Sequence, residues 1–167
     1  MSNEPTNAVE ARARVTELAR AARICMLTTI ALDGRQVSRP MGLQEAEFDG
    51  ELWFFADADS AKIRQIRVNP EVNVAFSDQK HNAWVSISGT ATEGFDRARA
   101  EQLWNPLLKA WFPDGLETPG LTLIKVHASS AEYWDSPSST VVNLFGYAKA
   151  AVTGQPPNAG ENHEVTF

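Results

Sequence analysis

The chain has 167 residues, of which 43% are hydrophobic and 22% charged, and these proportions are typical of one globular domain. Fifteen Lys and Arg against twenty-one Asp and Glu give a net charge of −6, the opposite of what a general nucleic-acid binder needs. Cys25 is the only cysteine, and no apolar run reaches the roughly 20 residues of a membrane span. We therefore expect a cytoplasmic protein without intrachain disulfides and without nucleic-acid or membrane partners.

Residues 1–7 are polar and are expected to be disordered, whereas a helix is predicted from Ala8 to Arg23. Asn7 followed by Glu10 fits a capping box at the start of this helix. One apolar stripe with helical spacing supports it, formed by Val15, Leu18 and Ala22.

Three strands linked by tight turns are predicted next, at residues 25–30, 36–43 and 51–56. The pairs Asp33-Gly34 and Asp49-Gly50 are typical of hairpin turns, because these residue types tolerate a positive φ. Pro40 lacks a backbone donor, which indicates an edge strand or an irregularity. The first half of the chain is therefore expected to be an antiparallel meander.

A short helix is predicted at 61–68, with Asp59 or Ser60 as its N-cap and Asn69-Pro70 as its end. The later elements are strands 72–77 and 83–93, a helix from Asp96 to about residue 106, strands 121–127 and 131–134, a helix 138–152 and a short strand 165–167. One domain is expected over 8–154, followed by a flexible tail at 155–167. Because short hairpin-linked strands dominate, the fold class is expected to be mainly β, a small closed barrel of about six to eight strands with peripheral helices.

Arg39 and the segment Ser60-Ala61-Lys62 are the first candidates for a binding site. Arg39 is either a solvated side chain or an anion clamp, since its guanidinium matches phosphate geometry and keeps its charge. Ser60 at a helix start is either a plain N-cap or part of a phosphate site. Lys62 in the first turn opposes the helix dipole, so an anion beside it would stabilise it.

The five tryptophans fall into two groups. Trp53 opens the run Trp53-Phe54-Phe55-Ala56, whose two faces are both apolar, and this run and Trp104 are interpreted as core. Trp84 opens a strand up to Ala91 whose small polar residues either line a cleft or face solvent. Trp111 and Trp134 lie at a loop and at a strand end, where large aromatics cover a ligand or a partner chain.

No catalytic group or metal site stands out. His81, His127 and His163 are far apart in the sequence, and no Cys pair or HExxH motif accompanies them. The chain has no GxGxxG before a helix, no P-loop and no GxSxG motif.

Taken in order, these segments resemble the FMN-binding split barrel of the pyridoxamine 5'-phosphate oxidase superfamily, and within it the bacterial general stress proteins. The resemblance covers roughly Ala19 to Ala151. It depends on the order and spacing of Ser38-Arg39-Pro40-Met41, Trp53-Phe54-Phe55-Ala56, Ser60-Ala61-Lys62, Asn69-Pro70-Glu71-Val72, Val85-Ser86-Ile87-Ser88-Gly89-Thr90-Ala91, Trp111-Phe112-Pro113-Asp114-Gly115 and Glu132-Tyr133-Trp134.

The resemblance implies an FMN site, with FAD as an alternative, at the interface of a homodimer. The implied cofactor-binding residues are Arg39, Pro40, Met41, Phe54, Phe55, Ala56, Ser60, Lys62, Trp84, Ser86, Trp111 and Trp134. Arg39, Ser60 and Lys62 match the residues that contact the FMN phosphate. Trp84 and Ser86 would reach the flavin bound mainly by the other chain, and Trp111 and Trp134 are candidates to cover its ring.

Two departures argue against oxidation of pyridoxamine phosphate. Trp84 stands where the true oxidases carry a glutamine toward the flavin, and their C-terminal Arg-x-His pattern is absent. A stress-related flavin-dependent oxidoreductase, with a nicotinamide as a candidate electron donor, is therefore the first expectation. The alternatives are a non-enzymatic flavin carrier or sensor and a deazaflavin-dependent reductase; haem ranks lowest because no histidine cluster is present.

Overall fold

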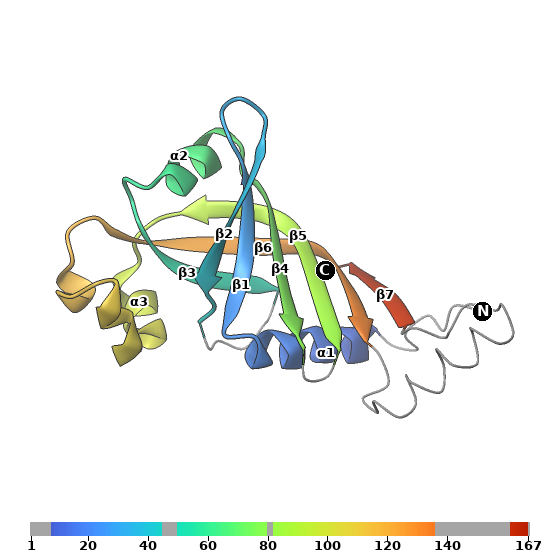
Figure 1. Ribbon diagram of the computed structural model, residues 1–167. Helices are drawn as coiled ribbons and strands as arrows, with labels where there is room; N and C mark the ends of the chain where they lie inside the picture. Colours follow the sequence, from blue (N-terminus) through green and yellow to red (C-terminus); the bar gives the residue numbers. More distant parts are fainter. Residues whose placement is uncertain (1–7, 45–49, 80–81, 136–160, 167) are drawn as a thin grey trace, which may run out of the picture.

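The computed structural model describes residues 8–44, 50–79, 82–135 and 161–166 (Figure 1). In chain order the elements are α1 (Ala8–Ala21), β1 (Ile24–Ile30), β2 (Gln36–Gly42), β3 (Glu51–Asp57), α2 (Ala61–Val68), β4 (Glu71–Asp78), β5 (Ala83–Glu93), α3 (Arg97–Leu103), the 3-10 turns η1 (Pro106–Ala110) and η2 (Gly115–Glu117), β6 (Leu121–Asp135) and β7 (Glu161–Thr166). The helix predicted at 61–68 is confirmed with those bounds.

One seven-stranded antiparallel sheet curls into an incompletely closed barrel. Its strand order is β2-β1-β4-β5-β6-β3, and β7 pairs with β6 beyond the end of β3. The end strands β2 and β3 approach each other without forming a ladder, so the barrel is split there. This geometry corrects the expectation of a closed barrel and agrees with a split barrel.

The expected meander of the first three strands is wrong at β3. The β1–β2 hairpin forms as predicted, with Cys25 opposite Met41. However, β3 pairs along its whole length with residues 121–127 of β6 rather than with β2. Pairing with β6 places β3 between two apolar clusters, so both of its apolar faces are covered.

The main core fills the inside of the barrel and is sealed at one end by α1. Val15 and Leu18 of α1, and Ala22 directly after it, are buried against the strands, as the apolar stripe predicts. In Figure 1, α1 runs along the bottom of the barrel, below the ends of β4 and β5. From β3 the main core receives Phe54, which is fully buried, and Ala56.

A second apolar cluster lies on the other side of β3 and β6. There Phe55 packs edge-on against Trp104 with ring centroids 5.5 Å apart, and Trp53 is partly buried nearby. The cover is built by α3, η1 and η2, which lie to the left in Figure 1. The predicted split of the run 53–56 into two apolar faces is therefore confirmed.

The C-terminal part of the chain differs from the prediction. The strands expected at 121–127 and 131–134 are one long strand, β6. Residues 161–166, expected to lie in a flexible tail, form β7 opposite residues 130–135, and Val165 is buried. The expected strand at 165–167 is thus longer and begins earlier, because pairing with the free edge of β6 satisfies its backbone. The helix predicted at 138–152 lies outside the described residues.

The outer side of the sheet formed by β2, β1, β4, β5 and the end of β6 is not covered by any helix among the described residues. We name it the open face, and it carries Ile24, Met26, Pro40, Asn73, Ala75, Trp84, Ser86 and Trp134. Trp84 and Trp134 are directly opposite in register and are 45% and 38% exposed. An exposed apolar surface of this kind is typical of an interaction site.

No helix in the described part of the chain is both long enough and apolar enough to cross a membrane. The same residues contain no group of three or more His, Cys, Asp and Glu side chains that could hold a metal ion.

Candidate functional site

Arg39 lies on β2, and its side chain points to the same face of the sheet as Leu27 and reaches α2. It is half-buried, and its Nη1 donates to Thr29 Oγ1 at 2.6 Å. Its Nη2 donates to Gln65 Oε1 of α2 at 3.1 Å. Arg39 is therefore held in place by hydrogen bonds to β1 and α2 and is not freely solvated.

Ser60 and Lys62 begin α2 beside this arginine. Ser60 occupies the N-cap position as predicted, but its Oγ donates to the carbonyl oxygen of Asp57 at 2.6 Å and does not cap the helix. The amide groups of the first helical turn are thus left without a side-chain acceptor, which is the arrangement that binds anions.

Arg39 and Lys62 are two cations that are partly removed from water and repel each other. Burial lowers the pKa of Lys62, the positive charge of Arg39 lowers it further, and Asp57 partly offsets this by raising it. Burial also lowers the pKa of Arg39. Among the described residues, neither cation forms a salt bridge with a carboxylate.

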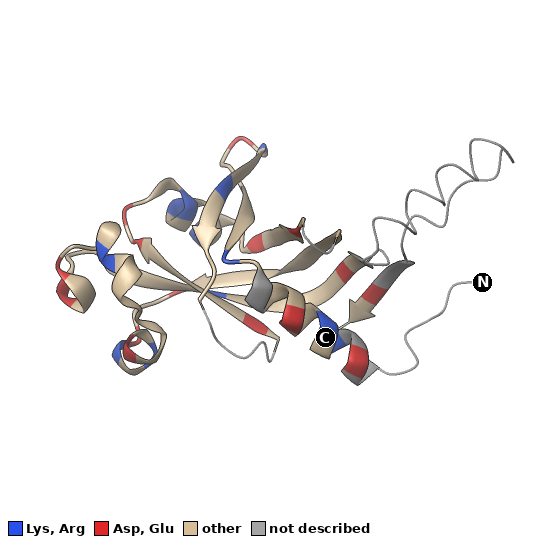
Figure 2. Cartoon of the chain, turned by 60° about the horizontal axis from the view of Figure 1, so that its bottom comes forward, with Lys and Arg blue, Asp and Glu red and all other residues tan. Residues whose placement is uncertain are grey.

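Figure 2 shows the basic segments of β2 and α2 close together. Two partly desolvated cations that repel each other are stabilised when an anion lies between them. Arg39, Lys62 and the start of α2 could therefore hold a phosphate group, and we name Arg39, Ser60 and Lys62 the phosphate cradle. In this structure Ser60 donates both its hydroxyl hydrogen and its backbone N–H to the carbonyl oxygen of Asp57, so it borders the cradle without a free donor.

Trp84, Ser86 and Trp134 are not part of the cradle within one chain. Their side chains project from the open face, whereas Arg39 shares the opposite side of the sheet with Leu27, which it faces in register. Ser86 accepts a hydrogen bond from Asn73 Nδ2 at 2.9 Å. These three residues can meet a ligand held by Arg39 only if that ligand, or a second chain, bridges the two sides.

Five other predicted residues lie along β2 and β3, beside the split. Pro40 is exposed on the open face, whereas Met41 packs against the main core. The side chains of Phe54, Phe55 and Ala56 are buried in the two apolar clusters, so only their backbone atoms could contact a ligand. The edge of β3 toward β2 has no ladder partner, so only the backbone groups that point to that edge, those of alternate residues, are available there.

Trp111 lies at the end of η1, on the side of the molecule built by α3. It is 72% exposed and follows Leu107, which is 70% exposed. The structure does not bring it into a ring contact or hydrogen bond with the cradle residues of the same chain.

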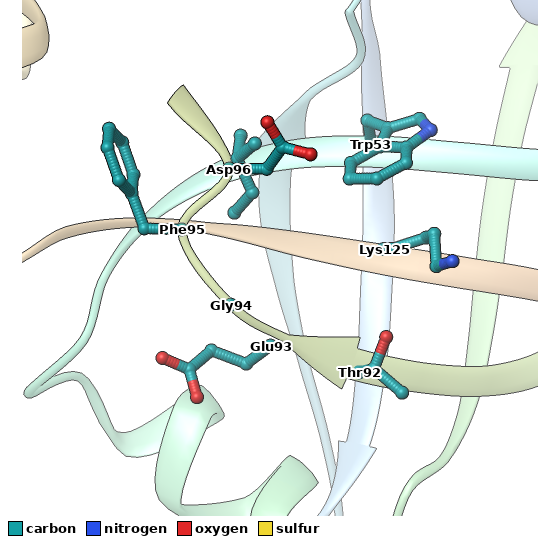
Figure 3. A pocket seen from close by; sticks show the side chains of 8 residues that line it. Trp53, Thr92, Glu93, Gly94, Phe95, Asp96 and Lys125 are labelled. Atoms are coloured by element: carbon teal, nitrogen blue, oxygen red, sulfur yellow. The ribbon is translucent and has the colours of Figure 1, made fainter. Parts of the chain in front are cut away.

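A separate hollow of about 250 Å³ lies between β3, β6 and the segment that leads into α3 (Figure 3). Its charged residues already have partners in the chain. Lys125 lies 3.4 Å from Glu51 and near the ring of Trp53, and Asp96 accepts from the backbone N–H of Arg99 to cap α3. We therefore assign no cofactor to this hollow.

Thr29 and Gln65, the two partners of Arg39, were not predicted from the sequence. Thr29 is fully buried although it is polar, and Gln65 follows Lys62 by three residues on the same helix face. A polar residue at an inward position of a predicted strand is a signal that could have identified Thr29.

Comparison with known proteins agrees with this fold. The family described as pyridoxamine 5'-phosphate oxidase like matches residues 10–158. Protein bli-3 of Neurospora crassa is 30% identical over 150 residues, which cover 84% of this chain and 72% of that protein.

Two solved structures are similar. The general stress protein 26 of Jannaschia sp. CCS1 has a TM-score of 0.77 at 24% identity, covering 95% of this chain and 99% of that chain. The general stress FMN/FAD binding protein of Xanthomonas citri has a TM-score of 0.69 at 33% identity, covering 78% of this chain and 92% of that chain. The chain therefore belongs to the pyridoxamine 5'-phosphate oxidase-like family, in its general stress protein branch.

Proposed function

We propose that this protein is a cytoplasmic homodimer that binds a flavin, FMN in the first place, and works as a stress-related flavin-dependent oxidoreductase. The observation that carries the proposal is the pair of half-buried cations, Arg39 and Lys62, which repel each other and form no salt bridge with a carboxylate among the described residues, although Asp57 partly offsets the repulsion at Lys62. A phosphate dianion between them would remove their mutual repulsion and accept charge-assisted hydrogen bonds.

The chain's own residues would bind and orient the cofactor. Arg39 and Lys62 would hold the phosphate, and the unpaired edge of β3 at residues 54–56 would hydrogen-bond with the flavin. A bound flavin supplies hydride and single-electron transfer chemistry. The relative from Xanthomonas citri that is named FMN/FAD binding supports this choice of ligand and leaves FAD as the alternative.

The open face supports the homodimer. Ile24, Met26, Trp84 and Trp134 expose apolar surface there, while the cradle lies on the other side of the sheet. A second chain docked on this face would bury the tryptophans and could present Trp84 and Ser86 to the flavin held by its partner. Trp111, exposed at the end of η1, and Trp134 are the candidates that would cover the ring.

A non-enzymatic flavin carrier or sensor is the second candidate. It is favoured by the segment Glu132-Tyr133-Trp134, which stands where substrate-handling residues would be expected near the end of β6. A true pyridoxamine phosphate oxidase is not proposed for the same reason. Rapid reduction of the bound flavin by NADH or NADPH, followed by turnover with an acceptor, would exclude a carrier.

Calorimetric titration with FMN, FAD and riboflavin tests the ligand directly. We expect FMN to bind more tightly than riboflavin, because only FMN carries the phosphate. Arg39→Ala and Lys62→Ala should each weaken FMN binding by about tenfold or more, since a hydrogen bond to a charged group is worth about 1.5–3 kcal/mol. Riboflavin binding should change little in both variants.

Arg35→Ala and Lys109→Ala are the matched controls. Arg35 is on the same hairpin as Arg39 and pairs with Asp33, and Lys109 is exposed on η1. Both remove one positive charge outside the cradle and should leave FMN affinity unchanged. A protein that binds none of the three flavins, or that binds FMN equally well without Arg39 and Lys62, would contradict the proposal.

A further inference from the structure

A hydrogen-bonded triangle lies behind the phosphate cradle and joins Arg39 of β2, Thr29 of β1 and Gln65 of α2. Arg39 donates to Thr29 Oγ1 at 2.6 Å and to Gln65 Oε1 at 3.1 Å. Thr29 Oγ1 closes the triangle by donating to Gln65 Oε1 at 2.6 Å. Because each corner belongs to a different element, the triangle fixes α2 relative to the β1–β2 hairpin.

The chemistry of the three groups leaves one arrangement of hydrogens. A guanidinium can only donate, so Thr29 Oγ1 must accept from Arg39 and send its own hydrogen elsewhere. That hydrogen goes to Gln65, whose carbonyl oxygen then accepts from both neighbours. The opposite orientation of the amide would place its NH₂ group against the Nη2 donor of Arg39, so the network itself assigns the position of Oε1.

Burial strengthens the hydrogen bonds of this network. Thr29 is fully buried and Gln65 is half-buried, so water competes weakly for these hydrogen bonds. Arg39 Nη1 is also 3.4 Å from the carbonyl oxygen of Leu27. The guanidinium is therefore held at one end by neutral groups of the protein.

The neutrality of these partners matters for the charge of Arg39. An arginine held by a glutamate would be fixed equally well, but its charge would be cancelled before any ligand arrived. Thr29 and Gln65 fix the group and leave its full positive charge. Gln65 also lies three residues after Lys62 on α2, so the same contact sets the separation of the two cations.

We propose that Thr29 and Gln65 are positioning residues that hold Arg39, with its charge intact, at the spacing from Lys62 that one phosphate group requires. This inference rests on the proposed function, because the phosphate is that of the flavin cofactor. Neither residue contacts the phosphate in this proposal, and both act through Arg39.

Gln65→Glu is the decisive variant, because it keeps size and acceptor geometry but adds a carboxylate opposite Arg39. We expect FMN affinity to fall by about tenfold or more, since the arginine charge is then paired within the protein. Riboflavin affinity should stay the same, and the thermal unfolding midpoint should stay the same or rise. A purely structural role for Gln65 would leave the ratio of FMN to riboflavin affinity unchanged.

Thr29→Val and Thr29→Ser give a second, independent test of the positioning role. Valine keeps the packing but removes the hydroxyl, so the FMN to riboflavin ratio should fall, whereas serine keeps the hydroxyl and should restore the ratio. If Thr29→Val fails to fold, Gln65→Glu and Gln65→Ala still decide, because Gln65 is only half-buried on α2.

The outcomes separate this proposal from the proposed function. A wild-type protein that shows no preference for FMN over riboflavin, and is not stabilised by inorganic phosphate, overturns both. A wild-type preference for FMN that persists in Gln65→Glu and Thr29→Val overturns the positioning role alone. A preference lost in both variants, with unchanged riboflavin binding, supports it.

Discussion

The backbone of Gly89 on β5 lies so close to the carbonyl oxygen of His127 on β6 that a Cβ atom at position 89 would be 2.2 Å from it. The approach coincides with a bulge, because the register shifts between Ser88 and Gly89 and Ser129 is the extra residue on β6. Ser129 Oγ donates to the carbonyl oxygen of Ser88 at 3.0 Å across the bulge. This is also the point at which the other edge of β6 changes its partner from β3 to β7.

Gly89→Ala should destabilise the protein. The methyl group would meet backbone and not a side chain that could move, so β5 and β6 must separate locally, at a cost of about 1–3 kcal/mol. Urea unfolding followed by tryptophan fluorescence measures the effect. Gly94→Ala is the control, because a Cβ there meets no atom within 4 Å. Equal unfolding midpoints for the two variants would contradict the close approach.

Strand β3 shows which structural features can be predicted from the sequence and which cannot. The run 53–56 predicts two apolar faces by its alternation alone, and the structure has Phe54 and Phe55 in separate clusters. What the run cannot predict is its partner, because strand pairing depends on contacts far apart in the sequence. The glycine of Asp49-Gly50 favours a nearby hairpin, yet β3 pairs with β6, about 70 residues later.

The candidate site can also be predicted only in part, because its local signals are visible in the sequence and its long-range contacts are not. Arg39 and Lys62 could be predicted because each carries a local signal, a charged residue in a strand and a lysine opposed to a helix dipole. The hydrogen-bond partners of Arg39 could not, since Thr29 reaches it through the β1–β2 register and Gln65 through the packing of α2. The inward position of Thr29 can mark it as a buried polar group that needs a partner, but nothing local indicates that this partner is Arg39.

Affinity for FMN should depend on pH through Lys62. Its pKa lies below the ordinary 10.5 in the free protein, because of burial and of Arg39. A bound phosphate favours the charged lysine, so affinity is fully present below the pKa of Lys62 and is lost as the pH rises through it. The loss should begin at a lower pH than for a solvated lysine.

The stability of the ligand-free protein should change in the opposite direction. Between the lowered pKa of Lys62 and 10.5 the unfolded chain binds more protons, so the contribution of Lys62 makes the folded state more stable as the pH rises through that window. Fluorescence titrations with FMN across alkaline pH test the affinity, with riboflavin reporting the ionisation of the ring itself. Lys62→Arg should abolish the alkaline loss, and a wild-type profile identical to that of Lys62→Arg would contradict the assignment.

Cys25 should be protected from thiol reagents. It is 2% exposed, burial raises its pKa to about 12 with a backbone hydrogen bond as the smaller, opposing effect, and Sγ lies 3.6 Å from the carbonyl oxygen of Met41. The reactive thiolate is therefore scarce at neutral pH, and labelling should proceed only as fast as the β1–β2 hairpin opens. Labelling with a chromogenic disulfide in native buffer and in urea measures this. Stoichiometric labelling within mixing time in native buffer would contradict the burial of Cys25.

The tryptophans of the open face should decide the oligomeric state. Aromatic anchors near the centre of an interface commonly contribute about 2 kcal/mol or more each, so Trp84→Ala with Trp134→Ala should raise the dimer dissociation constant by more than about tenfold. Sedimentation velocity over a range of concentrations measures the constant. Leu32→Ala is the control, because Leu32 is 74% exposed at the tip of the β1–β2 hairpin, away from the open face.

Flavin binding links that prediction to the cradle. If Trp84 of one chain contacts the flavin held by Arg39 and Lys62 of the other, FMN affinity should fall together with dimerisation in the double tryptophan variant. FMN should in turn strengthen dimerisation of the wild-type protein, because a ligand that binds only the dimer stabilises it by mass action. If the wild-type monomer binds FMN at full affinity, dimerisation and flavin binding are independent. The open face then has no role in cofactor binding.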